Sequence, residues 1–379
     1  MTKGISRPVW AEVDLGAIAH NVREIRRIVK PETKIMAVVK ANGYGHGALK
    51  IAQTALKNGV QYLSVATLGE AVKLREQGIE APILIMGYTT LDQVPDLLDY
   101  QITTTVFTLD MAEALSHGAL ERGEKAKVHI KIDTGMGRIG FMPQKGTVEL
   151  IKKIVNMEGL WVEGIFTHFA VADETDKTYT RQQFQSFTKL IADLEEEGIS
   201  IPIKHAANSA AIIDLPETHL DMVRAGIILY GLYPSSEVDK GRINLIPAME
   251  VKAKVSFVKK VGAGTSISYG RKYIVENEAV IASLPLGYAD GYTRRLSNQS
   301  QVLLGGKRIP VVGTICMDQL MVNASLVPEV KIDDEVVVIG RQGKEQITVE
   351  EVAKMLKTIN YEIICMISER VPRIYYNEV

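Results

Sequence analysis

Short apolar runs alternate with amphipathic helical patterns in the first 230 residues, and this rhythm limits the possible folds more than any other feature. The runs have the length of buried strands, and most intervening segments carry the apolar spacing of helices. Eight runs occur, at residues 35–39, 62–66, 83–86, 103–107, 128–132, 162–167, 203–207 and 223–229. Eight strands alternating with helices predict an α/β fold, a (β/α)8 TIM-type barrel, with a doubly wound open sheet as the alternative.

The pattern changes near residue 240 and becomes mostly β. Residues 249–257 alternate apolar and polar side chains, and residues 301–312 read as a hairpin around adjacent glycines. A further strand is expected at 335–340 and one helix at 348–359. The Pro-, Ser- and Gly-containing segment 234–242 is the expected linker.

The length of the chain supports two domains. A sequence of 379 residues is too long for one ordinary core. We therefore expect a (β/α)8 barrel domain over residues 1–240 and a mostly β domain over residues 241–379.

Composition excludes several classes of partner. Hydrophobic residues make up 46% and charged residues 23%, with a net charge of −1, which gives no reason to expect a nucleic acid or an anionic membrane as partner. No 18-residue apolar run occurs, and residues 1–10 lack the apolar core of a signal peptide. Cys316 and Cys365 lack CxxC spacing, so neither a zinc site nor a disulfide framework is indicated. A cytoplasmic enzyme or binding protein is the expected class.

Polar and glycine residues follow the predicted strands at the positions where barrels carry their active sites. A lysine stands out, because an ammonium group directly after the run at 35–39 and before a glycine-rich loop is unusual. The residues at these strand ends are Lys40, Tyr44, Asp133, Arg138, His168, Asn208, Ser209, Arg224, Gly226 and Ile227.

One glycine pattern needs separate treatment. Gly135, Gly137 and Gly140 fit the GxGxxG spacing of a dinucleotide-binding loop. That loop requires a helix to open within the motif, whereas Pro143 and Gly146 delay the next helix to about residue 147. A tight turn at the strand end is the better interpretation.

Each of these residues has an ordinary structural explanation when taken alone, since a lysine after a strand is usually solvated. Together they indicate more specific chemistry. A lysine beside other cations is easily deprotonated, as imine chemistry requires. Glycine-flanked amides with Ser209 and Tyr44 hydroxyls suit a phosphate, and Arg224 suits a ring nitrogen. This combination is what pyridoxal 5′-phosphate (PLP) needs.

The order of motifs resembles the alanine racemase family of PLP enzymes along nearly the whole chain. The motifs are "AVVKANGYGHG", "IDTGMGRIG", "THFA", "ANS", "RAGIILYG", "SISYGR", "LPLGYADGY", "GTICMD" and "RVPR". The resemblance implies an isomerase that interconverts L- and D-alanine, which supplies a peptidoglycan precursor, and a homodimer with shared active sites.

The resemblance also implies roles for individual residues. Lys40 would hold PLP and act as one base, and Tyr269 would be the second base. Met317, through its amide, and Arg138 would meet the substrate carboxylate, and Lys131 would be carbamylated. Tyr44, Ser209, Gly226, Ile227 and Tyr361 would bind the phosphate, Arg224 the pyridine nitrogen, and His168 and Asn208 would complete the cofactor site, with His168 joining Arg224 to Tyr269.

Three alternatives can be weighed against this interpretation, and the sequence disfavours two of them. A broader-specificity racemase of the same family is the strongest, because one methylene is weakly discriminated. A PLP lyase of the aldolase type would carry an HxC motif, which this sequence lacks. A PLP carrier protein would lack the second domain. Tyr288 and Asp173 match entrance positions, and Thr314 stands where some relatives carry arginine, which leaves the charge of the entrance open.

Overall fold

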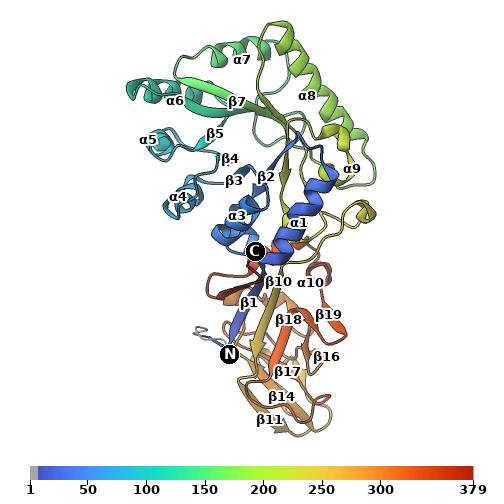
Figure 1. Cartoon of the computed structure of the whole chain (residues 1–379). Coiled ribbons are helices and arrows are strands. Elements are labelled where there is room, and N and C mark those ends of the chain that lie inside the picture. Colours follow the sequence, from blue (N-terminus) through green and yellow to red (C-terminus); the bar gives the residue numbers. More distant parts are fainter. Residues whose placement is uncertain (1–6, 379) are drawn as a thin grey trace. The chain divides into compact units, whose positions relative to one another are not determined.

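The computed structural model describes residues 7–378, so residues 1–6, which include most of the segment used to argue against a signal peptide, lie outside it. Contacts divide the chain into two units (Figure 1). Within the described residues, unit 1 comprises 7–16, 44–47 and 248–378, and unit 2 comprises 17–43 and 48–247.

Unit 2 is a barrel of eight parallel strands, as the sequence predicts. Their hydrogen-bonded order is β8-β7-β6-β5-β4-β3-β2-β9. The two end strands meet as well, because the amide of Asp221 donates to Lys204 O and that of Arg224 to Ala207 O. The strands are β2 (Lys34–Val38), β3 (Tyr62–Val65), β4 (Ile83–Ile85), β5 (Thr103–Val106), β6 (Ala126–Lys131), β7 (Leu160–Phe166), β8 (Ile203–His205) and β9 (Met222–Ala225).

Helices follow most of these strands and bury their apolar faces. The cap of α4 shows how the sequence starts such a helix: the Thr67 side chain accepts from the Glu70 amide, and the Glu70 carboxylate accepts from the Thr67 amide. The helices are α1 (Leu15–Ile28), α2 (Lys40–Tyr44), α3 (Ala48–Lys57), α4 (Leu68–Glu76), α5 (Val94–Asp99), α6 (Leu109–Glu121), α7 (Thr147–Val155), α8 (Thr178–Glu196) and α9 (Ser209–Asp214).

Unit 1 is mostly β, as expected. Its main sheet has the order β16-β15-β18-β10-β1-β20, with β19 paired to β18, beside sheets β11-β14-β17 and β12-β13. The elements are β1 (Val9–Asp14), β10 (Met249–Lys254), β11 (Phe257–Val261), β12 (Ser266–Ile267), β13 (Tyr273–Ile274), β14 (Ala279–Leu284), β15 (Gln301–Leu304), β16 (Lys307–Pro310), β17 (Leu320–Asn323), β18 (Glu335–Gln342), β19 (Glu345–Ile347), α10 (Val349–Leu356), α11 (Asn360–Met366) and β20 (Arg373–Tyr376).

The strand predictions for this unit need one correction. The hairpin at 301–312 is present as β15 and β16, with Gln301 opposite Pro310. The run at 249–257 is not one strand, because β10 ends at Lys254 and β11 begins at Phe257 in a different sheet. Alternation continues across this break, which is why the sequence does not reveal it.

The contacts divide the chain at 247/248, whereas the sequence places the boundary at 240/241. The side chain of Asn21 explains the difference: it donates to Ile246 O and accepts from the Ile246 amide, which holds this segment to α1. The amino-terminal β1 belongs to unit 1 because it pairs with β10 and β20. These pairings join segments far apart in sequence, so local patterns do not show them.

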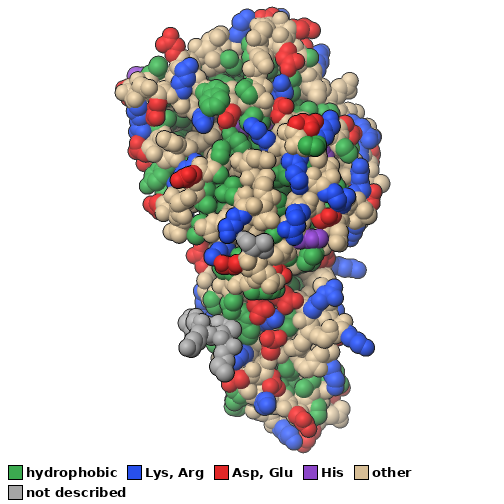
Figure 2. Space-filling view, in the orientation of Figure 1, with side chains coloured by type: hydrophobic (Ala, Val, Ile, Leu, Met, Phe, Trp, Pro, Cys, Tyr) green, Lys and Arg blue, Asp and Glu red, His purple; other side chains and the backbone are tan. Residues whose placement is uncertain are grey.

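Charged side chains of both signs are interspersed over the face drawn in Figure 2, in keeping with the net charge of −1. Within residues 7–378, no helix combines the length and the apolar composition needed to cross a membrane.

Candidate active site

Lys40 lies where the sequence places it, at the carboxyl end of β2 and the start of α2. The following residues are strained: Ala41 and Asn42 have φ values of 51° and 52°, in the left-handed region that such residues rarely adopt. The Gly43 amide closes the turn on Val39 O at 2.8 Å, and Glu70 accepts from the Ala41 amide at 2.6 Å. Strain held by such contacts is typical of functional loops.

Arg224 is buried at the end of β9, with 2% of its surface exposed. Its guanidinium donates to Nδ1 of His205 at 3.0 Å and to the carbonyls of Thr167 and Ala206 at 2.9 and 2.8 Å. These acceptors carry no formal negative charge. Burial therefore lowers the pKa of Arg224 to about 9, assisted by the nearby charge of Arg138.

His168 follows β7 and contacts Arg224 as predicted. Its Nδ1 lies 3.2 Å from the Arg224 guanidinium, which can only donate, so this nitrogen accepts. Burial, then the charges of Arg224, Arg138, Lys131 and Lys40, hold the pKa of His168 well below its usual value. The imidazole is therefore neutral at physiological pH.

Ser209 and Gly226 lie together at the ends of the last two barrel strands. The Gly226 amide donates to Ser209 Oγ at 3.0 Å, and Ile227 begins the 3₁₀ turn that follows. Because Ser209 Oγ accepts from an amide, its own hydrogen is available to donate. Asn208 caps α9 by accepting from the Ala211 amide at 3.1 Å, which is a structural role.

Lys131 ends β6 and is 2% exposed. Its ammonium nitrogen donates to Ile132 O at 2.6 Å and lies 5.7 Å from the Phe166 ring centroid. Burial lowers the pKa of Lys131 to about 7, although Asp133 opposes this shift. A large fraction of this amine is therefore neutral near pH 7.

The glycine-rich segment after β6 is a turn organised by Asp133. Its carboxylate accepts from the amides of Gly135, Gly137 and Arg138 at 3.0, 3.0 and 3.1 Å. The next helix, α7, begins only at Thr147. The interpretation as a strand-end turn is correct, and it leaves the Arg138 side chain exposed at the barrel's strand ends.

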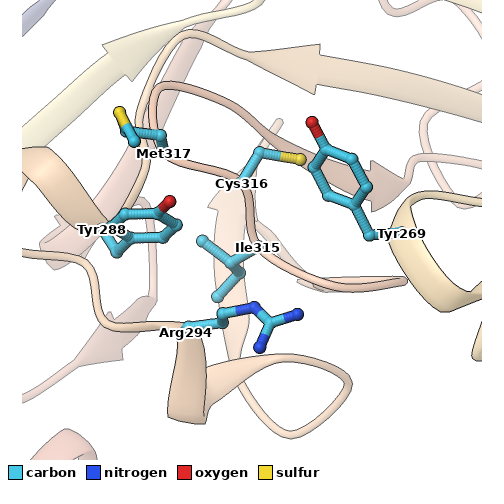
Figure 3. Close-up of a pocket in the computed structure, with 6 residues that line it drawn as sticks. All are labelled: Tyr269, Tyr288, Arg294, Ile315, Cys316 and Met317. Carbon is cyan, nitrogen blue, oxygen red and sulfur yellow. The ribbon is translucent and has the colours of Figure 1, made fainter.

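Unit 1 carries a second group of predicted residues around a cavity of about 370 Å³, which we call the exposed pocket. Figure 3 shows the Tyr269 ring beside the sulfur of Cys316, and Tyr288 beside Met317. Tyr269 is 69% exposed and Met317 is 53% exposed, so both side chains are open to solvent in this chain. The lining residues are Tyr269, Tyr288, Arg294, Ile315, Cys316 and Met317.

Thr314 directly precedes Ile315 of the exposed pocket and is buried. It is 3% exposed, and its hydroxyl donates to Tyr269 O at 2.9 Å. Ser268, whose φ is 63°, donates in turn to Thr314 O. Thr314 therefore fixes the backbone of Tyr269.

Asp290, which the sequence analysis did not single out, supports the same pocket. Its buried carboxylate pairs with Arg7 and accepts from the Gly287 amide at 3.0 Å. The adjoining amides of Tyr288 and Ala289 donate to the carbonyls of Cys316 and Met317, both at 3.1 Å. Asp290 thus braces the loop that holds Met317; the motif "LPLGYADGY" was the available signal.

The predicted phosphate ligands fall into two groups. Tyr44 and Tyr361 lie together in unit 1, with ring centroids 6.1 Å apart, whereas Ser209, Gly226 and Ile227 lie in unit 2. Tyr44 is buried, which raises the pKa of its hydroxyl. Residues 44–47 join unit 1 because the Arg373 guanidinium donates to Gly45 O at 2.8 Å. Asp173, in unit 2, accepts from Ser235 through its backbone carbonyl.

Two family models match the chain. They are described as "Alanine racemase, N-terminal domain", over residues 13–234, and "Alanine racemase, C-terminal domain", over residues 248–375. An alanine racemase of Methanococcus maripaludis is 54% identical over 371 residues, covering 98% of this chain and 99% of the relative. One of Desulforamulus reducens is 55% identical over 371 residues, covering 98% and 100%.

Solved structures agree with these matches. An alanine racemase of Clostridium difficile 630 superposes with a TM-score of 0.94 at 45% identity, covering 98% of this chain and 96% of that one. An alanine racemase from E. faecalis gives a TM-score of 0.93 at 39% identity, covering 99% and 100%.

Proposed function

The chain belongs to the alanine racemase family and interconverts the enantiomers of alanine, and we propose that it does so with PLP, using Lys40 and Tyr269 as bases. The observation that carries the cofactor assignment is the buried guanidinium of Arg224, held by acceptors without a carboxylate among its described hydrogen-bond partners.

The residues present in the barrel suit PLP. Arg224 is purely a donor, so it is matched to an unprotonated pyridine nitrogen rather than to a protonated one. Ser209 has a hydroxyl hydrogen to offer to a phosphate, and we propose that the amides of Gly226, which lies 3.0 Å from Ser209 Oγ, and of Ile227 donate to it as well. Tyr44 and Tyr361 would add hydroxyl donors, and Lys40 would supply the amine that binds the cofactor covalently.

When bound, PLP supplies the electron withdrawal that makes the substrate Cα–H bond acidic. Racemisation then requires a proton to be removed on one face and returned on the other. We assign these two faces to the Lys40 amine and the Tyr269 hydroxyl, each acting as base in one direction and acid in the other. His168 orients Arg224 by accepting its N–H, and we propose that it also reaches Tyr269.

Arg224 restrains the chemistry in this proposal. A guanidinium keeps its proton, so it cannot transfer that proton to the ring nitrogen as a carboxylic acid could. Electron withdrawal stays moderate, and transamination is suppressed.

Substrate selection is assigned to Met317 and Arg138, whose amide and guanidinium suit the alanine carboxylate. Lys131 would be carbamylated and would position Arg138 in that form. Its lowered pKa supports this, because only a neutral amine reacts with carbon dioxide. Tyr288 and Asp173 would lie on the substrate's entry path. A broader-specificity racemase remains the alternative, separated by its activity on larger amino acids.

We further propose a homodimer in which the partner's barrel faces the exposed pocket. The exposure of Tyr269 and Met317 supports this, because a tyrosine acting as an acid and base works best away from bulk water. We place the enzyme in the cytoplasm, supplying D-alanine as a peptidoglycan precursor.

Solvent deuterium entry at Cα tests the function. We expect L- and D-alanine to exchange Cα–H for deuterium and interconvert, with serine and larger amino acids much slower. Comparable rates across the panel would favour the broader racemase, and no exchange would contradict both assignments. Borohydride should also fix one PLP on the peptide that carries Lys40; label on another lysine would reject Lys40 as the attachment site.

A further inference from the structure

A continuous chain of hydrogen bonds runs through the barrel interior behind Arg224, and we call it the barrel relay. It consists of Arg224, His205, His129, Glu163 and Tyr62, from five different strands and each at most 8% exposed. Nδ1 of His205 lies 3.0 Å from the Arg224 guanidinium, and Nε2 of His205 lies 2.9 Å from Nδ1 of His129. Nε2 of His129 lies 3.3 Å from the Glu163 carboxylate, to which Tyr62 also donates.

Donor and acceptor chemistry fixes the protons along this chain. Arg224 can only donate, so Nδ1 of His205 accepts and its proton sits on Nε2. That Nε2–H donates to Nδ1 of His129, which therefore carries its own proton on Nε2 and donates to Glu163. A second proton on either imidazole would place two N–H groups against each other. Both histidines are thus neutral Nε2–H tautomers.

The surroundings agree with this assignment. Burial is the main cause that lowers the pKa of both His129 and His205. Burial raises the pKa of Glu163, but bonds from His129 and Tyr62 more than offset it, so the carboxylate stays ionised. The charges from outside the relay that act on these groups are cationic: Lys34 acts on His129, Lys127 on Glu163, and Lys131 on His205.

Packing holds the relay in a single orientation. A Cβ on Gly164 would lie 2.4 Å from Nδ1 of His129, so only glycine leaves room for this imidazole. The Phe166 ring stacks on His205, with centroids 4.7 Å apart and planes tilted by 10°. Neither the His129 ring nor the His205 ring can rotate without displacing a neighbour.

The relay meets an electrostatic need. A buried guanidinium is costly unless a negative charge compensates it, and the direct partners of Arg224 provide none. The relay connects it to a carboxylate, and every hydrogen bond from Arg224 through His205 and His129 to Glu163 is polarised in the same direction. We propose that Glu163 is a positioning residue for Arg224: through His129 and His205 it fixes the guanidinium and moderates its donor strength. The catalytic consequence rests on the proposed role of Arg224 opposite PLP.

The first test needs no variant. Nitrogen NMR of the protein with labelled histidine, with and without PLP, should show His129 and His205 as neutral Nε2–H tautomers from about pH 5 to pH 8. Protonation of either ring in that range, or an Nδ1–H tautomer, would overturn the relay. This result does not depend on activity, so it separates failure of the relay from failure of the proposed function.

The second test uses variants with opposite expected signs. Glu163→Gln keeps the shape but removes the charge, so Arg224 becomes a stronger donor to the ring nitrogen. Tyr62→Phe removes a donor to the carboxylate, leaving it more basic, so Arg224 becomes a weaker donor. The ratio of transamination to racemisation should rise by at least roughly twofold in the first and fall in the second.

Controls separate this role from a structural one. Glu163→Asp, which keeps the charge, should restore the ratio toward the original value. Asp214→Asn disrupts the Lys177–Asp214 pair elsewhere in unit 2 and should leave the ratio unchanged. An unchanged ratio in Glu163→Gln, or a change of the same sign in Tyr62→Phe, would overturn the proposal. If Glu163→Gln does not fold, the tautomers of His129 and His205 in the nitrogen NMR spectrum still test the relay.

Discussion

The two groups of candidate residues are built in contrasting ways. In the barrel, Lys131 and Arg224 are almost completely buried at strand ends, and their pKa values are lowered by burial. In the exposed pocket, Tyr269 begins a short 3₁₀ turn and Met317 lies on a loop; both are more than half exposed and are held through their backbones. The barrel residues are in an environment that shifts the pKa values of catalytic groups, whereas the side chains of the exposed pocket are open to solvent. The contrast supports the proposed homodimer, in which a second chain would complete the active site.

The largest effect should come from removing either proposed base. Lys40→Ala and Tyr269→Ala should each lower kcat by about 10²–10⁴-fold, the usual contribution of a positioned acid or base. Steady-state racemisation in both directions measures this. Tyr88→Phe, which alters another exposed tyrosine, is the matched control and should retain full activity. If the Tyr269→Ala enzyme stayed active, the exposed pocket would have no part in the mechanism.

Arg224→Glu should remove the restraint that Arg224 is proposed to place on transamination. A carboxylic acid can share a proton with a ring nitrogen, so transamination should increase relative to racemisation, racemisation should slow, and the visible absorption of the bound cofactor should change. Pyruvate formation per racemisation event gives the ratio. An unaltered ratio would show that Arg224 does not control the ring nitrogen.

Burial of Lys131 predicts a pH dependence of stability. Its pKa falls from 10.5 to about 7 on folding, so the unfolded chain binds more protons between these values. The free energy of unfolding should therefore rise with pH across this window, by an amount on the order of a few kcal/mol in unmodified protein. Lys131→Met should flatten the rise.

Denaturant titrations of carbon-dioxide-free protein from pH 7 to pH 10 would measure the effect of Lys131. Returning bicarbonate should add the mass of one carbon dioxide to the native chain but not to Lys131→Met. A rise of the same slope in Lys131→Met would assign the pH dependence to other groups.

The smallest effect is expected at Asp290. Asp290→Asn weakens the brace on the loop that holds Met317, so KM for alanine should rise by roughly three- to tenfold with a smaller change in kcat. Glu345→Gln, which alters the Arg308–Glu345 pair of the same unit, is the control. If both variants instead lowered kcat and raised KM to the same extent, the cause would be general destabilisation.

Local patterns were enough to predict the barrel and to place His168 and Arg224 at its strand ends, whereas the contact between the two residues was expected only from the family resemblance. Apolar runs mark buried strands, and the ends of parallel strands meet at one edge, so residues after different strands come together. Such reasoning could not place β1 or residues 44–47 in unit 1, because those contacts span most of the chain. It also missed His129 and Glu163, because a polar residue within a strand gives no sign of its partner.

Mixing two inactive variants tests the shared site most directly. Lys40→Ala and Tyr269→Ala chains, exchanged into heterodimers, should form one site with both bases intact and one with neither. Activity should return to about half the original value per heterodimer, well above the 10²–10⁴-fold losses of the parents. If each site drew both bases from one chain, heterodimers shown to be present would have only the average activity of the two variants, and the account would be wrong.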